Sequence, residues 1–357
     1  MKNPDLFTLL SCVALLAALP ARAADEAPGK PYGVTKTVRV GGPGGWDYVY
    51  ADSEARRLYV PRGDHISVYD LDSLEPVATI PGSGNVHGVA VDPASHHAFS
   101  SSRPVLMWDS RTLAQVKSIQ TEGRPDGILF EPATERVYVL SHQAPNVTVI
   151  DGKSGDIVGT IDVGGEPEEA ASDGAGHVYI DVEDKDNVAV VDAKSLAVTA
   201  HYPLGGKGGG PAGLALDARN HVLFVFCRNP NTAVILDARD GRIINTLPIG
   251  HGVDAAEFNP DTGEAFSSQG DGTLTVIREA GPDQFTVEQT VKTRTGARTS
   301  TLDGKTGHIV LVTADRKEVP TPTPAPTTTP AAPGAAQPQR RWPEMVPDSF
   351  TILVVGR

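Results

Sequence analysis

Charged residues recur along the chain at intervals of about 40 residues. They are Asp47, His87, Asp126, Glu168, Asp254 and Arg298, with Ala212 at the corresponding place in one interval. Carboxylates held close together repel one another unless a cation or a proton neutralises them. The pattern therefore predicts a site for a hard cation with oxygen ligands, such as Ca²⁺ or Mg²⁺, formed by Asp47, Asp126, Glu168 and Asp254. The alternative is a water-filled acidic channel.

A second set of polar residues lies in loops that we expect to open on the same face of the molecule. This set comprises His65, Arg103, His142, Lys185, Arg228, Asn229 and Gln269. Functional side chains tend to lie on loops that a rigid scaffold positions. We therefore predict a ligand-binding face made of His87, Asp126, Glu168, Asp254, Arg298, His142, Arg228 and Asn229.

Three kinds of chemistry fit this face. The first is binding of a small polar molecule, a peptide or a protein partner without turnover, and it is the interpretation that we favour. The second is metal-assisted hydrolysis of a lactone or ester, with His87 as general base. The third is a periplasmic accessory protein that binds a redox cofactor, which needs several histidines, and only His87 and His142 are placed for it.

Other motifs give no support for catalysis. The chain has no Gly-x-Ser-x-Gly and no Cys-x-x-Cys-His sequence. Cys227 lies at the end of the apolar run FVFC, where we expect a buried residue rather than a nucleophile. Zinc fits the acidic site poorly, because His87 is the one nitrogen ligand at that level.

An internal repeat must position these residues. Each unit contains a short apolar segment, a polar turn, an aromatic and β-branched run, a loop, and an alternating run that ends in Asp; residues 126–151 read DGILFEPATERVYVLSHQAPNVTVID. The alternating runs end at Asp70, Asp109, Asp151, Asp192, Asp237 and Arg278, at intervals of 39 to 45 residues. A period near 40 with four short strands per unit is typical of β-propeller blades. We predict an all-β, seven-bladed propeller in which the first strand of each blade lines the central channel.

The seventh unit is split between the two ends of the repeat region. Its runs 297–303, 307–315 and 349–356 supply three strands, and an unassigned run at 35–40 supplies the fourth. We therefore predict one propeller domain over 35–357, whose N-terminal strand closes the ring by joining the C-terminal blade. Residues 316–348 interrupt this blade with a Pro/Thr/Ala-rich insert, a composition that predicts a disordered loop.

These units resemble the YVTN-repeat, YncE-like β-propellers, a family of exported bacterial proteins. The resemblance lies in LYVPR, VYVLS and VYIDV on the predicted second strands, and in VTVID, VAVVD and AVILD on the third. It covers nearly all of residues 35–357 and implies the fold rather than an activity. The Asn of the YVTN pattern is absent here.

The N-terminus reads as a signal peptide over 1–23, followed by a flexible segment over 24–34. Lys2 precedes an apolar run over 6–19, and Ala21-Arg22-Ala23 forms a small-x-small cleavage site. The run is shorter than the ~20 residues that span a bilayer, so we expect no transmembrane span in the mature chain. A lipid anchor at Cys12 and an uncleaved anchor are alternatives. We predict a periplasmic or secreted protein, held by burial alone because cleavage would leave Cys227 unpaired.

The overall charge limits the partners. The 357 residues carry a formal charge of −13, with 31 Lys and Arg against 44 Asp and Glu. Nucleic acids and anionic lipids require a positive field, so we expect neither as a partner. We predict a monomer that binds through one face of the ring.

Overall fold

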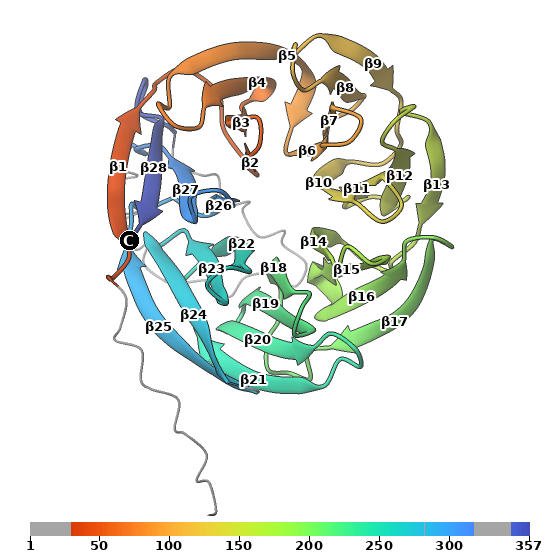
Figure 1. Ribbon diagram of the computed structural model, residues 1–357, viewed down its shortest axis with the longest axis vertical. Helices are drawn as coiled ribbons and strands as arrows, with labels where there is room; N and C mark the ends of the chain where they lie inside the picture. The colour runs from red at the N-terminus through yellow and green to blue at the C-terminus, as the bar shows by residue number, and fades with distance from the viewer. Residues whose placement is uncertain (1–29, 282, 318–343) are drawn as a thin grey trace, which may run out of the picture. The chain divides into compact units, whose positions relative to one another are not determined.

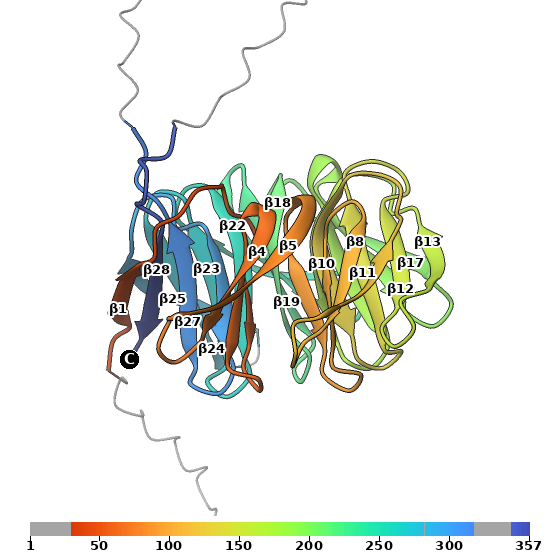
Figure 2. The ribbon, with the colours of Figure 1, turned by 90° about the horizontal axis from the view of Figure 1, so that it is seen from above.

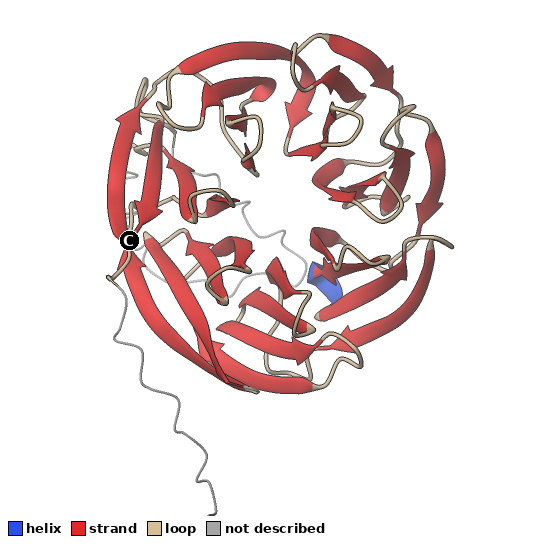
Figure 3. Ribbon diagram, in the orientation of Figure 1, coloured by secondary structure: helices blue, strands red, loops and turns tan. Residues whose placement is uncertain are grey.

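Runs of β-branched and aromatic residues form the strands of the molecule. In the third blade, RVYVLS forms β11 and VTVID forms β12, and the two pair in antiparallel register from Arg136–Asp151 to Leu140–Val147. Side chains on both faces of these strands are buried, which explains why the runs are almost continuously apolar. The same pairing recurs around a ring of seven four-stranded antiparallel sheets (Figures 1 and 3).

The computed structural model describes residues 30–281, 283–317 and 344–357. The chain divides into a short unit, Met1–Pro31, and a second unit, Tyr32–Arg357, which holds the ring. The predicted signal peptide and most of the predicted insert lie outside the described residues and stay predictions.

The first four blades each take their strands from one continuous segment. Blade 1 holds β2 (Tyr50–Asp52), β3 (Arg57–Pro61), β4 (Gly63–Asp70) and β5 (Pro76–Val86). Blade 2 holds β6 (Val89–Asp92), β7 (His97–Ser100), β8 (Val105–Asp109) and β9 (Gln115–Ile119). Blade 3 holds β10 (Pro125–Glu131), β11 (Arg136–Ser141), β12 (Val147–Asp151) and β13 (Ile157–Ile161). Blade 4 holds β14 (Pro167–Ser172), β15 (His177–Val182), β16 (Asn187–Asp192) and β17 (Ala197–Pro203), with a 3₁₀ turn η1 (Glu183–Lys185) between β15 and β16.

The last three blades complete the ring. Blade 5 holds β18 (Pro211–Asp217), β19 (Val222–Arg228), β20 (Asn231–Asp237) and β21 (Ile243–Pro248). Blade 6 holds β22 (Val253–Asn259), β23 (Glu264–Gln269), β24 (Thr273–Gly281) and β25 (Gln284–Lys292). Blade 7 holds β26 (Thr299–Asp303), β27 (His308–Thr313), β28 (Thr351–Gly356) and β1 (Gly33–Arg39). Seen edge-on, the strands of each blade run between the two faces of the ring (Figure 2).

The predicted ring closure is confirmed. Strand β1 pairs antiparallel with β28, and Thr37 lies opposite Leu353. The strand begins at Gly33, two residues before the predicted start. Strands β27 and β28 flank the predicted insert in the chain, and Arg316 and Met345 form an isolated antiparallel bridge.

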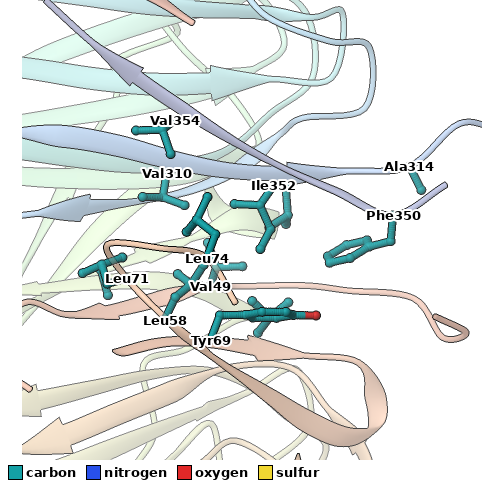
Figure 4. Close-up of a cluster of buried hydrophobic side chains, with 13 residues drawn as sticks. Val49, Leu58, Tyr69, Leu71, Leu74, Val310, Ala314, Phe350, Ile352 and Val354 are labelled. Carbon is teal, nitrogen blue, oxygen red and sulfur yellow. The ribbon is translucent and has the colours of Figure 1, made fainter. Parts of the chain in front are cut away.

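The core lies between blades rather than at the centre of the ring. Within the described residues, seven hydrophobic clusters each join two neighbouring blades. Figure 4 shows the cluster between blades 7 and 1, where Phe350 and Ile352 pack near Leu58 and Tyr69. Each blade therefore buries both of its faces against its neighbours, and the ring holds the starts of the inner strands at fixed positions.

The Asp that ends each third strand acts locally. Asp151 Oδ1, for example, accepts the backbone N–H groups of Lys153 and Ser154. Asp70, Asp109, Asp192 and Asp237 accept turn N–H groups in the same way. These residues cap turns on the face opposite the predicted site, as expected for Asx turns.

Candidate functional site

The inner strands start at one mouth of the ring, and backbone irregularities there point acidic side chains inward. In blade 3 the register between β10 and β11 shifts between Pro125 and Ile128, so Asp126 lies in the irregular stretch. The equivalent shifts in blades 4 and 6 enclose Glu168 and Asp254. Such bulges re-aim side chains and are common beside functional sites.

The predicted site residues meet in a continuous network that we call the mouth ring. Its members come from all seven blades: Asp47, His87, Asp126, His142, Glu168, Arg228, Asp254 and Arg298. Anionic and cationic side chains alternate along most of it. Each carboxylate therefore lies beside a partner of opposite or potentially opposite charge, which offsets the repulsion that the sequence predicts.

His87 bridges two carboxylates. Its Nδ1 lies 2.7 Å from Asp47 Oδ2 and 3.0 Å from Asp126 Oδ1. Burial lowers the pKa of His87, but the hydrogen bonds and the negative charges of Asp126 and Asp47 outweigh it and raise the pKa to about 10. At neutral pH the imidazole is then protonated, a state in which it holds two carboxylates together but accepts no proton as a general base.

His142 occupies the next place in the mouth ring. Its Nε2 lies 2.8 Å from Glu168 Oε2 and 3.1 Å from Asp126 Oδ2. The hydrogen bond to Glu168 raises the pKa of His142 against the effect of burial, and Asp126 adds to the rise. At the other nitrogen of the same imidazole, Nδ1 of His142 accepts a hydrogen bond from Arg124 Nη2 at 2.8 Å.

Arg228 holds the second half of the mouth ring. Its guanidinium group donates to Glu168 Oε1 at 3.0 Å, to Glu183 Oε1 at 2.5 Å and to Asp254. Arg298 Nε lies 3.0 Å from the other oxygen of Asp254. Burial raises the pKa of Asp254 to about 7, although both guanidinium groups oppose this shift.

The other predicted face residues do not join this network. Asn229 is exposed, and its backbone N–H donates to the carbonyl of Gly209. His65 pairs with Asp64, Lys185 pairs with Asp184, and Arg103 donates to the carbonyl of Gly123. Gln269 is buried and bonds to Ser267 and Thr273 within blade 6.

Sequence reasoning missed two members of the site. Glu183 directly follows β15, and His142 and Arg228 lie at the corresponding ends of β11 and β19, so repeat position could have identified Glu183. Arg124 precedes β10 and occupies neither of the two repeat positions that supply the predicted site residues. No sequence signal indicates its hydrogen bond to His142.

Two groups of side chains offer atoms close enough to share a metal ion. Within the described part of the chain, these groups are Asp47 with His87 and Asp126, and Asp126 with His142 and Glu168, their ligand atoms lying within 4.8 Å of one another. Asp254 is in neither group, so the four predicted carboxylates do not gather at one point. Each group contains one imidazole, which the predicted all-oxygen site did not include.

Below the mouth, the central channel contains a cavity of about 420 Å³. Residues of all seven inner strands line it, among them Tyr48, Glu168, Glu169 and Glu257. Burial raises the pKa of Glu257 to about 8 and that of Glu169 well above its usual range. Three glutamates thus line the channel, and two of them, Glu169 and Glu257, favour the neutral form.

Over the described residues, no helix is long and apolar enough to cross a membrane. No family model matches the chain. Two curated relatives match part of it: the uncharacterized protein YncE of Salmonella typhimurium (strain LT2) is 30% identical over 147 residues, and YncE of Salmonella typhi is 29% identical over 147 residues. Each match covers 38% of this chain and 40% of the relative, so the similarity spans about two fifths of either length.

Solved structures share the fold across most of the chain. The WD40 repeats of RRP9 superpose with a TM-score of 0.70 at 12% identity, covering 91% of this chain and 97% of that chain. Hydrazine synthase of Kuenenia stuttgartiensis gives a TM-score of 0.58 at 18% identity, covering 66% of this chain and 84% of that chain. These likenesses show the fold alone. The chain thus shares a seven-bladed β-propeller fold with these structures, and over 147 residues it is similar in sequence to YncE.

Proposed function

We propose that this protein binds a small polar molecule or a short peptide at the mouth of its ring. The observation that carries the proposal is the mouth ring itself, to which every blade contributes at least one charged side chain. Histidines and carboxylates dominate the part on blades 1 to 4, and arginines the part on blades 5 to 7. A ligand with both donors and acceptors would find partners on both sides.

A thermal-shift panel tests this proposal. The purified chain would be heated with amino acids, dipeptides, dicarboxylates, polyamines and monosaccharides, and a ligand is expected to raise the unfolding midpoint by mass action. The shift should be lost in Arg228→Gln, which removes one of the two guanidinium groups of the mouth ring.

Arg239→Gln is the matched control, because Arg239 also belongs to blade 5 but pairs with Asp237 at the opposite end of the blade. A panel without any shift would refute the proposal. So would a shift that persists in Arg228→Gln.

A second candidate function is metal-dependent hydrolysis of a lactone or ester, which the group of Asp47, His87 and Asp126 favours. A metal-bound imidazole usually donates its other N–H to an acceptor. Asn85 Nδ2 lies 2.8 Å from His87 Nε2, and a half-turn of this amide group would place its acceptor oxygen there instead. His142 is less suited, because its second nitrogen faces Arg124, a donor.

Thermal unfolding separates this candidate from simple binding. After chelator treatment, Ca²⁺, Mg²⁺, Mn²⁺ or Zn²⁺ at ~100 times its dissociation constant should add about 2.7 kcal/mol of stability. Asp126→Asn should abolish the gain, whereas Glu183→Gln, outside the group, should keep it. An ion that passes this test would justify assays with simple lactones, and no gain with any ion would remove the candidate.

We further propose that the protein works as a monomer in the periplasm or outside the cell. The apolar run over 6–19 and the small-x-small site at Ala21-Arg22-Ala23 support export. Fractionation, the mass of the mature chain and light scattering test this proposal. A full-length mass in the cytoplasmic fraction would contradict it, and a dimer would contradict the monomer.

A further inference from the structure

The cavity of the central channel extends away from the mouth ring towards the opposite face of the molecule. Within the described part of the chain, Glu168 is the one member of the mouth ring that lines it. The cavity follows β14 from Glu168 to Ser172, the last residue of that strand. Leu216, Phe258 and Leu302, which directly precede the last residues of β18, β22 and β26, line it as well. The channel therefore reaches the face on which the Asx turns lie.

Tyr48 crosses the channel at its mouth end. It lies two residues before β2 in blade 1, and its hydroxyl donates to the backbone carbonyl of Glu168 in blade 4 at 3.3 Å. Strands β2 and β14 face each other across the centre of the ring (Figure 1). A side chain that joins them separates the mouth ring from the cavity below it, so a ligand of the cavity would enter from the opposite face.

Two carboxyl groups of the channel wall have no cation beside them in that wall. Among the described residues that line the cavity there is no Lys, Arg or His. Glu169 Oε2 accepts the backbone N–H of Leu214, on β18, at 2.7 Å. Glu257 comes from β22, which packs on the other side of β18. A cation bound between these two side chains would supply the counter-charge that the wall lacks.

Ser300 adds a polar group to the same wall. It lies on β26, lines the cavity and is 4% exposed. Within the described residues its hydroxyl oxygen is buried and has no hydrogen-bond partner. Buried hydroxyl groups are normally hydrogen-bonded, so this one indicates a missing partner. An ammonium group has three N–H donors and no acceptor, which suits two carboxyl groups and one hydroxyl oxygen.

The end of the channel farthest from the mouth ring has an apolar wall. The side chains that form it are half-buried rather than fully packed: Leu129, Leu216, Phe258 and Leu302. An alkyl chain or an aromatic ring that lies against them would be removed from water, which favours binding. The channel thus combines an acidic middle with an apolar end.

We propose that the central channel binds a primary amine with an apolar tail. Its ammonium group would lie between Glu169, Glu257 and Ser300, and its tail would lie along the apolar wall towards the face opposite the mouth ring. This site is separate from the mouth ring, and the inference goes beyond the proposed function.

Calorimetric titration of the full chain with matched probes tests the charge and the tail. Hexylamine, hexanol and hexanoate have the same tail and are positive, neutral and negative at pH 7. Hexylamine should bind at least about tenfold more tightly than hexanol, and hexanoate should not bind. Propylamine should bind more weakly than hexylamine, by up to about fourfold for each methylene group removed.

Variants locate the binding. Glu257→Gln should weaken hexylamine binding about tenfold, because a charged acceptor is lost, and Ser300→Ala about fivefold. Glu54→Gln is the matched control, because Glu54 is exposed in the turn between β2 and β3, outside the cavity. Unfolding midpoints of the free variants show that each one is folded.

Several results would overturn the inference. They are hexanol binding as tightly as hexylamine, unchanged affinity in Glu257→Gln, and no binding of hexylamine. Hexylamine binding that is lost in Arg228→Gln but kept in Glu257→Gln would belong to the mouth ring, and it would also overturn the inference. If hexylamine does not bind but a compound of the thermal-shift panel does, and Arg228→Gln abolishes its effect, the inference fails while the proposed function stands.

Discussion

At the scale of single residues, Arg228 connects more carboxylates than any other member of the mouth ring. It contacts Glu168, Glu183 and Asp254, and two of these are at most 7% exposed. We expect Arg228→Gln to lower the free energy of unfolding by about 3 kcal/mol at neutral pH, because buried carboxylates lose a counter-charge. Urea unfolding measures this change.

The control for that prediction is Arg239→Gln. Arg239 is 66% exposed in its pair with Asp237, and surface pairs contribute about 0–1 kcal/mol. If the two variants lost the same free energy of unfolding, the ion pairs of Arg228 would be screened by solvent like surface pairs. That result would contradict the prediction.

Asp181 gives the clearest pH dependence. It is fully buried on β15, with Glu168, Glu183 and Arg228 nearby, and burial raises its pKa to about 8. Between the unfolded value of about 3.9 and about 8, the folded chain holds a proton that the unfolded chain lacks, so stability falls as pH rises. Asp181→Asn has no such proton. Its unfolding free energy relative to the parent should therefore increase across this window and level off above it, as urea unfolding at several pH values would show.

For Asp237 we expect stability to change with pH in the opposite direction. Its hydrogen bond to Arg239 lowers its pKa to about 2, against the effect of burial. The stability from this residue is present above the unfolded pKa of about 3.9 and is lost as pH falls towards 2. Asp237→Asn should thus cost stability at neutral pH and nothing at the acid limit. If the unfolding free energy of both variants, relative to the parent, changed with pH in the same direction, one of the two assignments would be wrong.

At the scale of structural elements, the conformation of the loop over 41–45 is held by hydrogen bonds from one side chain of another loop. Arg62, between β3 and β4, is 2% exposed, and its guanidinium group donates to the carbonyls of Gly41, Gly42, Pro43, Gly44 and Gly45. This loop leads directly to Trp46. Arg62 therefore holds the backbone of the residues that precede Trp46, including the carbonyl of Gly45 at 3.0 Å.

We expect Arg62→Lys to release this loop, because one ammonium group has three donors and cannot reach the same set of carbonyls. Hydrogen exchange of backbone amides over 41–46 should become faster, while exchange in β20 stays unchanged. Unchanged protection of 41–46 would mean that the loop is held by its other contacts.

The sequence predicts the blades and the mouth well because both follow from the repeat. Alternating apolar runs fix the strand faces, and the position within a unit fixes the end of the ring at which a residue lies. Asp126, Glu168 and Asp254 were found in this way. The predicted second-to-third-strand loops also supplied His142 and Arg228.

The pairing within the mouth is not contained in the repeat. Whether Arg228 turns towards Glu183 or into solvent depends on rotamers and on η1, which interrupts one blade alone. A cavity of about 760 Å³ beside Trp46 likewise depends on aperiodic segments, among them residues 45–46 and 293–296. Lys185 and Gln269 have the corresponding position in their blades but pair with neighbours in their own blades, which shows that place in the repeat gives a position and not a contact.

At the scale of the whole molecule, a buried polar cluster joins the residues that flank β1 and β28, Tyr32 and Arg357, to blade 6. Glu264 is 0% exposed, accepts the Tyr32 hydroxyl at 2.7 Å, and pairs with Arg357 and Arg278. The Arg357 guanidinium also lies 4.3 Å from the Tyr32 ring. Glu264→Gln should lower the unfolding midpoint and speed amide exchange in β1 and β28, since two cations lose a buried partner.

Glu288→Gln is the matched control, because Glu288 contacts the same arginines, Arg278 and Arg357, from a more exposed position at 27%. Its effect on exchange in β1 should be smaller. If Glu288→Gln sped amide exchange in β1 as much as Glu264→Gln, the more exposed Glu288 would stabilise β1 as strongly as the buried Glu264.

Closure by β1 and β28 has a consequence for how the chain is made. The hydroxyl of Thr35 bonds to the carbonyl of Val354, 319 residues later. At synthesis rates of about 5–20 residues per second, β1 waits roughly 15–60 s for its partner, while blades 1 to 6 can form from contiguous segments. A strand that stays unpaired for that time can pair with another chain and aggregate, and charged residues, especially Lys, are common on such strands because they oppose this pairing. Within β1, Lys36 and Arg39 supply such charges until β28 is made.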